Sequence, residues 1–369
     1  MKKHIIAVAV AAAFAAPAVM ADTTLYGLAN MSLDYIDVGD GKSIARDAKT
    51  DTFVQVGTVD GSSNVNVQSG SSRIGIKGSE KISNDLSAVY QAEFGVQMSD
   101  GTTALTNRNQ YVGLSSKSFG TFIAGRHDTP MKLAVSKYDL FGDQIGDNGN
   151  VAGAKYGTSA GFNLRTPNTI AYLTPDFAGF NATLAYVADH DAVDATAGYD
   201  NNNNQAFSVS AGYAYKKLFN ATIAYENHQQ KAPAVSTVET SETAFMVGAG
   251  LAMSGFTLNG LYQQIQNFDD VKVNIWGVGA AYNFGKKHTV KGQFYSADYD
   301  QYPDSRNMFA LGYDFAMSKQ TTLYAAYAYG DNAQSTWGDG HEGKTPIGGK
   351  TGLSDQDSNA FSVGMKYKF

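Results

Sequence analysis

The 369-residue chain has no cysteine, only 7 prolines and 2 tryptophans, and no long apolar run beyond its amino terminus. Without cysteine, disulfides cannot hold an exported chain together. Without a run of about 20 apolar residues, the rest of the chain predicts no membrane-spanning helix. The charges, 28 Lys plus Arg against 34 Asp plus Glu, include no basic run of the kind that binds nucleic acid.

The amino terminus has the pattern of a secretory signal peptide. Lys2 and Lys3 precede an apolar run over 5–16, and small residues follow up to Ala21. A positive region, a short apolar region and small residues before a cleavage site characterise such peptides. The alternative, a membrane-spanning helix, requires a longer run. The pattern therefore predicts a signal peptide over 1–21 and one mature domain over 22–369.

Apolar residues are plentiful but dispersed by alternation. They make up 43% of the chain, with 22 Tyr and 20 Phe, yet the mean hydropathy is −0.26. In the last nine residues, 361–369, Phe, Val, Met, Tyr and Phe alternate with Ser, Gly, Lys and Lys. Because successive side chains of a strand point to opposite faces, one face of this segment is apolar and the other polar. The apolar face suits either a soluble core or lipid.

The alternation recurs along the chain and allows the strands to be counted. It is clearest over 86–97, 180–186, 207–215, 219–226 and 323–329. Links of alternating length require sixteen strands, which predicts an all-β fold, a sixteen-stranded antiparallel transmembrane barrel. A soluble sandwich is the alternative, but it leaves the regular polar residues of the second face unexplained. The short links are 78–85, 116–120, 175–179, 216–217, 253–255, 285–288 and 317–320, and the long links are 37–69, 99–105, 128–164, 189–204, 229–241, 267–272, 300–305 and 332–358.

A barrel of this width predicts a pore. Barrels of about eight strands are filled by their own side chains, whereas barrels of about sixteen enclose an aqueous channel. The polar face, rich in Ser, Thr, Asn and Gln, can be satisfied only by water or by its own members. We therefore expect passive passage of ions and small hydrophilic solutes, with selectivity set by whatever narrows the lumen.

Several short motifs occur in a fixed order along the mature chain. Together with the terminal strand they are TLYG at 24–27, SRIGIKG at 72–78, YVGL at 111–114, FGT at 119–121 and GR at 125–126. With these motifs the chain resembles the general diffusion porins of Gram-negative bacteria, in particular their neisserial and β-proteobacterial branch. The resemblance implies an outer-membrane homotrimer in which the third external loop folds inward. It also implies a constriction between acidic residues on that loop and arginines on the barrel wall.

The same resemblance assigns residues to the two sides of the constriction. The inward loop should be 128–164, with Leu140, Phe141 and Ile145 as its anchors to the wall. The alternatives are a mobile external loop and arginines that bind lipopolysaccharide phosphate or solvent. Relatives can carry a lysine where this chain has Leu28, which would weaken the basic side. The predicted wall residues are Arg73, Lys77, Arg108 and Arg165, and the predicted loop acids are Asp139, Asp143 and Asp147.

Strand alternation supports some of these assignments better than others. Arg73 has the parity opposite to Ile74, so it faces the lumen if that isoleucine faces lipid. Arg108 is less consistent, because its parity would also place Val112 inside. Arg126 has the parity of Phe122, so we expect it to point outwards and leave it out of the pore set.

Other functions find less support in the sequence. An enzyme would need a nucleophile or metal motif, and the six histidines lie in none. Asp189-His190-Asp191 resembles a metal cluster but is better explained as a solvated loop tip; we expect no metal or other cofactor. A substrate-selective channel remains the main alternative, with Trp276 and Tyr282 as candidates for an aromatic track. The expected partners are outer-membrane lipids, lipopolysaccharide, ions and small hydrophilic solutes.

Overall fold

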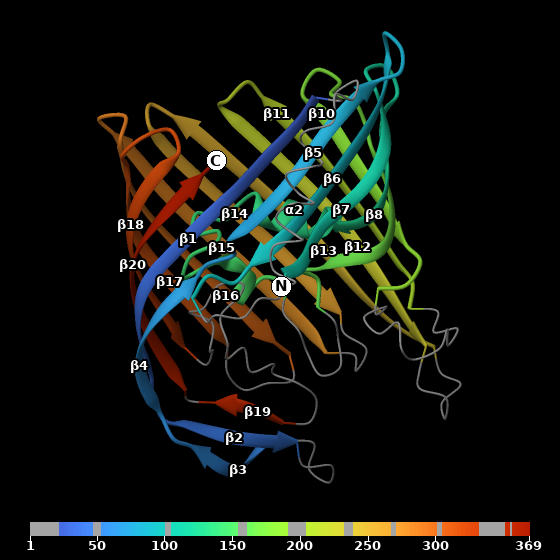
Figure 1. Cartoon of the computed structure of the whole chain (residues 1–369). Helices are drawn as coiled ribbons and strands as arrows, with labels where there is room; N and C mark the ends of the chain where they lie inside the picture. Colours follow the sequence, from blue (N-terminus) through green and yellow to red (C-terminus); the bar gives the residue numbers. More distant parts are fainter. Residues whose placement is uncertain are drawn as a thin grey trace, which may run out of the picture.

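The alternating segments form a closed antiparallel barrel in the computed structural model (Figure 1). Its described residues are 22–46, 53–99, 105–153, 161–190, 204–231, 239–266, 271–300, 305–331, 351–354 and 356–369. The predicted signal peptide, 1–21, lies outside them. No helix within these ranges is long and apolar enough to cross a membrane.

Sixteen wall strands make up the barrel, as predicted. β4 and β5 both pair with β1, one after the other, and together form one interrupted wall strand. β1 also pairs with β20, which closes the ring. The strands are β1 (Asp22–Val38), β4 (Ser62–Ser69), β5 (Arg73–Lys81), β6 (Leu86–Val96), β7 (Leu105–Ser116), β8 (Gly120–Asp128), β9 (Arg165–Leu173), β10 (Phe180–Val187), β11 (Ala206–Tyr215), β12 (Phe219–Lys231), β13 (Glu239–Met253), β14 (Phe256–Gln266), β15 (Lys272–Phe284), β16 (His288–Tyr299), β17 (Arg306–Ala316), β18 (Thr321–Asp331) and β20 (Asp357–Lys368).

Alternation along each strand separates a lipid-facing surface from the lumen. In β20, Phe361 and Met365 are 50% and 46% exposed on the outside, whereas Ser362 between them is 1% exposed. The outward apolar side chains face the acyl chains of the bilayer. The bilayer core offers no water to the backbone, and the closed ladder of strand hydrogen bonds satisfies the backbone N–H and C=O groups instead. The short links then lie at the periplasmic end of the barrel and the long links at the other.

The first long link departs from the prediction. Residues 37–69 were expected to be a polar connection, but β4 within that range belongs to the barrel wall. The link also contains β2 (Gly41–Arg46) and β3 (Phe53–Val59), which form a separate sheet with β19 (Thr351–Ser354) in the order β19-β2-β3. This small sheet lies beyond one end of the barrel (Figure 1). Polar composition alone does not distinguish such a sheet from a coil.

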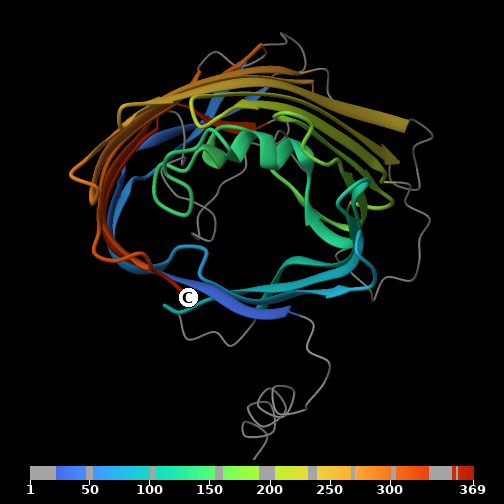
Figure 2. The same ribbon diagram turned by 90° about the horizontal axis from the view of Figure 1, so that it is seen from above.

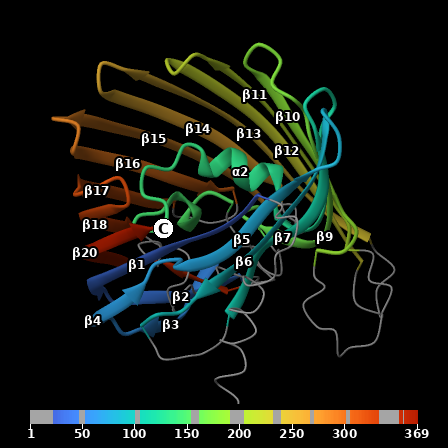
Figure 3. The same cartoon turned by 45° about the horizontal axis from the view of Figure 1, so that its top comes forward.

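The segment between β8 and β9 is here called L3 (129–164), and its described residues lie inside the ring of strands (Figures 2 and 3). It contains α2 (Pro130–Ser136) and the short 3-10 helix η1 (Asn148–Asn150). Thr129 caps α2, since its hydroxyl accepts a hydrogen bond from the Lys132 N–H at 3.2 Å. The described part of L3 therefore occupies space that would otherwise be open lumen.

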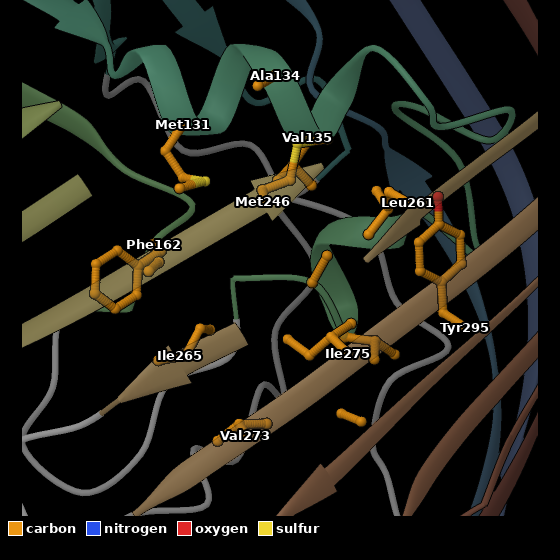
Figure 4. Packing of buried hydrophobic residues seen from close by; sticks show 14 of the residues in the cluster. Met131, Ala134, Val135, Phe162, Met246, Leu261, Ile265, Val273, Ile275 and Tyr295 are labelled. Atoms are coloured by element: carbon orange, nitrogen blue, oxygen red, sulfur yellow. The ribbon is translucent and has the colours of Figure 1, made fainter. Parts of the chain in front are cut away.

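One face of α2 packs against the inner wall formed by β10 to β13. Met131 and Val135 of the helix meet Met246 of β13 in a buried cluster (Figure 4). Tyr295 on β16 extends the cluster and donates a hydrogen bond to the Tyr138 carbonyl at 3.0 Å. This apolar contact holds L3 against the inner wall from β10 to β16, so L3 narrows the lumen from that side.

Candidate functional site

Arg73 and Asp143 meet between the wall and L3. The Arg73 Nη1 atom lies 3.1 Å from Asp143 Oδ2, and the side chains are 24% and 26% exposed. Arg73 is on the lumen face of β5, as its alternation with Ile74 predicts. A predicted wall base and a predicted loop acid are thus in direct contact.

The backbone around Asp143 fixes its carboxylate toward Arg73. Asp143 adopts a left-handed conformation, with φ of 62°. Its N–H donates to Asp147 Oδ2 at 3.1 Å, and its carbonyl accepts from Asn30 Nδ2 at 2.5 Å. Gly70 makes this approach possible, because a Cβ there would lie 2.9 Å from the Asp143 carbonyl oxygen. The break between β4 and β5 coincides with this contact.

The side chains of the other two predicted acids accept hydrogen bonds from L3 itself and from Gln293 of the wall. Asp147 caps η1, because its Oδ1 accepts the Gly149 N–H at 2.8 Å while its Oδ2 accepts the Asp143 N–H. Asp139 Oδ1 accepts from Gln293 Nε2 and from the Phe141 N–H, both at 2.9 Å. Burial raises the pKa of Asp139, although these hydrogen bonds oppose the shift. Asp143 is therefore the predicted acid that the structure brings to a wall arginine.

Arg108 reaches the lumen through a β-bulge. Its Nε lies 2.5 Å from Glu93 Oε1, and the Tyr26 hydroxyl donates to the second oxygen at 2.9 Å. The register of β6 and β7 shifts beside Glu93, so that β7 has one extra residue. Val112, 63% exposed, therefore faces outwards although strict alternation groups it with Arg108. The expectation that Val112 shares a face with Arg108 is therefore wrong.

Arg165 forms a second charged group on the wall. Its Nη2 lies 3.1 Å from Asp128 Oδ1, and its Nε donates to Asn109 Oδ1 at 2.9 Å. Lys132 of α2 approaches the same carboxylate at 3.4 Å, so two cations share one anion. Arg126, which was expected to point outwards, is half-buried and interacts electrostatically with both Arg165 and Asp128.

The remaining wall positions differ from each other. Lys77 is exposed, with its ammonium 5.1 Å from the centre of the Tyr26 ring. Leu28, where a relative can have lysine, is buried. Two lysines that were not among the predicted residues also reach L3, from β20 and β16. Lys366 donates to the Gly142 carbonyl at 2.7 Å, and Lys291 donates to Gln144 Oε1 at 2.8 Å. Both belong to polar faces of alternating strands, which is the signal that could have found them.

The tip of L3 is anchored as predicted. Phe141 and Ile145 are completely or almost completely buried, and Leu140 packs beside them. The wall makes room with small residues, since a Cβ on Gly312 would lie 2.7 Å from the Phe141 ring. The cluster around the tip consists of Ile36, Val38, Ala310, Ala326, Ala328 and Ala360.

A buried ionic triad supports the other arm of L3. His228 lies between two carboxylates, with Nε2 at 2.7 Å from Glu226 and Nδ1 at 2.8 Å from Glu242. A neutral imidazole has one N–H, so the protonated ring is the form that donates to both. Phe162 of L3 stacks on this ring, 4.5 Å between centres. This triad was not predictable from the sequence, because Glu242 lies 14 residues beyond His228 and meets it only through the pairing of β12 with β13.

Two other sequence hypotheses can be compared with the structure. Trp276 and Tyr282 lie on the outward face of β15 together with Val278, so they do not form an aromatic track in the lumen. Trp276 instead packs near Phe294 on the outside. Within the described ranges, no three His, Asp or Glu side chains form a group that could hold a metal ion. Asp191 of the suspected metal cluster lies outside the described residues.

Comparison with known proteins agrees with this architecture. Residues 7–335 match a family model described as Gram-negative porin. Outer membrane porin protein 32 of Delftia acidovorans is 29% identical over the full length of both chains. An anion-selective porin from Comamonas acidovorans superposes with a TM-score of 0.73 at 22% identity, covering 95% of this chain and all of that one. The trimer form of OmpT from Vibrio cholerae gives a TM-score of 0.64 at 16% identity, covering 94% and 99%. This chain belongs to the Gram-negative porin family.

Proposed function

We propose that L3 and the wall strands β5 to β9 form a charged constriction in this porin. The protein is a passive diffusion channel of the outer membrane rather than an enzyme. The contact of Arg73 with Asp143 is the observation that supports a constriction, because it joins L3 to the lumen face of the wall in a partly exposed ion pair. Ions and small hydrophilic solutes would pass beside this pair.

The charges around the constriction favour anions. Arg73 and Arg108 each have one acidic partner, whereas Arg165 and Lys132 share Asp128. Lys366 adds a further ammonium at the L3 tip, where it donates to a carbonyl and shares the Asp143 carboxylate electrostatically with Arg73. Unit charges about 4 Å apart interact by roughly 4 kcal/mol at an effective dielectric of 20, so one uncompensated cation changes the local potential appreciably. We infer a preference for anions, the property named for the Comamonas structure.

Replacement of Arg73 tests the constriction. R73Q removes a permanent cation beside the aperture, so the anion-over-cation permeability ratio should fall. The measurement is the reversal potential of the purified protein in a planar bilayer under a salt gradient. K286Q serves as the control, because Lys286 is exposed in a short periplasmic turn. A reversal potential that R73Q leaves unchanged would remove Arg73 from the constriction.

We also propose a homotrimer, with β1 and β4 to β7 as the subunit interface. Rings of Tyr and Trp mark the sectors of a barrel that meet the lipid–water boundary. Such residues are dense on β10 to β18 but scarce on β1 and β4 to β7, where the exposed large side chains are mainly aliphatic. The aliphatic set is Leu25, Leu33, Val65, Val67, Ile74, Ile76, Leu105, Val112 and Leu114.

A bulky residue should separate the subunits only within this sector. V112W adds an indole to β7 and should shift the particle from trimer to monomer. V278W adds the same group to the aromatic-rich side and should leave the trimer intact. Native mass spectrometry in detergent reads the subunit number directly, and equal behaviour of the two variants would refute this interface.

We further propose cleavage after Ala21, which amino-terminal sequencing of the outer-membrane protein would test.

A further inference from the structure

An apolar groove of about 440 Å³ opens across β10, β11 and β12. Phe180 and Ile223 on its sides are 59% and 50% exposed, so they face outwards. Thr222, which alternates with Ile223, faces the lumen instead and accepts a hydrogen bond from Lys137 of L3. The outward side chains that line the groove are Phe177, Phe180, Ala182, Ala211, Tyr213, Ala221 and Ile223.

The groove lies at the periplasmic end of the outer wall. Phe177 belongs to the short link between β9 and β10, and the Phe180 and Tyr213 rings pack 4.4 Å apart beside the first ladder pairs. Alanines opposite these rings leave the space that larger side chains would fill. The strands involved lie outside the aliphatic sector proposed as the subunit interface. Lipid is therefore the medium that covers this surface.

Two lysines stand next to the groove at the membrane boundary. Lys216 and Lys217 form the exposed turn between β11 and β12. The Lys216 ammonium lies 5.2 Å from the centre of the Tyr215 ring, and that residue shares its face with Tyr213. At roughly 3.4 Å per residue, this turn is about 10 Å from the groove. The nearby Asp176 carboxylate accepts the Gly179 N–H at 2.9 Å within its own turn.

We propose that the groove and the Lys216–Lys217 turn bind one anionic glycerophospholipid. An acyl chain would lie in the groove, and its phosphate would meet the two ammonium groups. Burial of a chain that is already in a bilayer gains no hydrophobic transfer energy, so close packing and charge must distinguish a bound lipid from a bulk one. The alanine floor with its aromatic sides supplies the packing, and the paired lysines supply the charge at headgroup level.

Native mass spectrometry of the delipidated protein tests the site. Phosphatidylglycerol is titrated into the detergent-solubilised wild type and into K216S/K217S, whose apparent affinity should fall roughly fivefold per lysine. The matched control is K286S/K287S, which removes two lysines from another short turn and should retain the affinity. A211L keeps every charge but fills the groove, so it should also weaken binding. Phosphatidylcholine, which has no net charge, should bind the wild type more weakly.

The outcomes separate a defined site from diffuse attraction to the barrel rim. Equal losses in K216S/K217S and K286S/K287S would overturn the proposal, as would unchanged affinity in A211L. Single-channel conductance checks that each variant is folded, because the groove faces away from the lumen. Failure of the lipid site would leave that conductance untouched and so would not bear on the proposed constriction.

Discussion

At the scale of single residues, the three predicted acids of L3 differ in what they bind. Asp143 pairs with Arg73, Asp147 caps η1, and Asp139 lies against Gln293. The three side chains are identical and are spaced four residues apart on a polar segment, so the sequence alone cannot show which environment each one has. Backbone conformation decides, since the positive φ of Asp143 turns its carboxylate to the wall.

Asp139 should make the docking of L3 depend on pH. Burial raises the pKa of Asp139 in the folded protein. The contribution of Asp139 to the stability of the docked loop is therefore fully present below the unfolded pKa near 3.9 and is lost as the pH rises through the folded pKa. Amide hydrogen exchange in 130–150 should therefore be slowest in acid after correction for intrinsic rates. D139N should flatten this dependence, whereas D85N, in a short turn, should not. A wild-type profile without any such pH dependence would contradict the assignment.

At the scale of elements, L3 is attached to the wall at two separate points. The Phe141–Ile145 tip fills a cluster of alanines, and Phe162 stacks on the His228 ring. The apolar anchors were predictable, because Leu140, Phe141 and Ile145 stand out in a polar segment. The ionic anchor was not, and neither was the bulge that brings Arg108 inside, since one extra residue in a strand leaves no mark on alternation before the partner strand is known.

Removal of the tip anchor should loosen the constriction. F141A leaves a cavity under L3 and should cost the docked loop about 3–5 kcal/mol. Single-channel recordings should then show a larger mean conductance with more open-channel noise. L133A is the control, since Leu133 is a partly exposed residue of α2 whose truncation makes no buried cavity. Conductance and noise identical to wild type in F141A would show that this anchor does not hold the loop.

At the scale of the whole molecule, the barrel was predictable because lipid imposes the same alternation on every wall strand. The count of sixteen and the periplasmic position of the short links follow from that single constraint. Segments beyond the bilayer, such as the β19-β2-β3 sheet, are not subject to this constraint and were not predicted. The same holds for contacts in the lumen between distant segments. The pairing of β1 with β20 that closes the barrel, here called the seam, is also a long-range feature. At the seam, Gly27 and Phe369 exchange backbone hydrogen bonds at 2.9 and 3.2 Å.

Gly27 should be needed for closure of this seam. A Cβ there would lie 2.3 Å from the Phe369 ring and 2.7 Å from the Arg73 carbonyl oxygen, and the carbonyl cannot move without breaking the ladder. G27A should therefore destabilise the barrel by about 1–3 kcal/mol and lower the temperature at which the folded band disappears in semi-native electrophoresis. G260A is the matched strand control, because its nearest contact would be 3.3 Å. If both variants unfold at the same temperature, the seam tolerates a side chain and the tight contact at Gly27 does not limit closure.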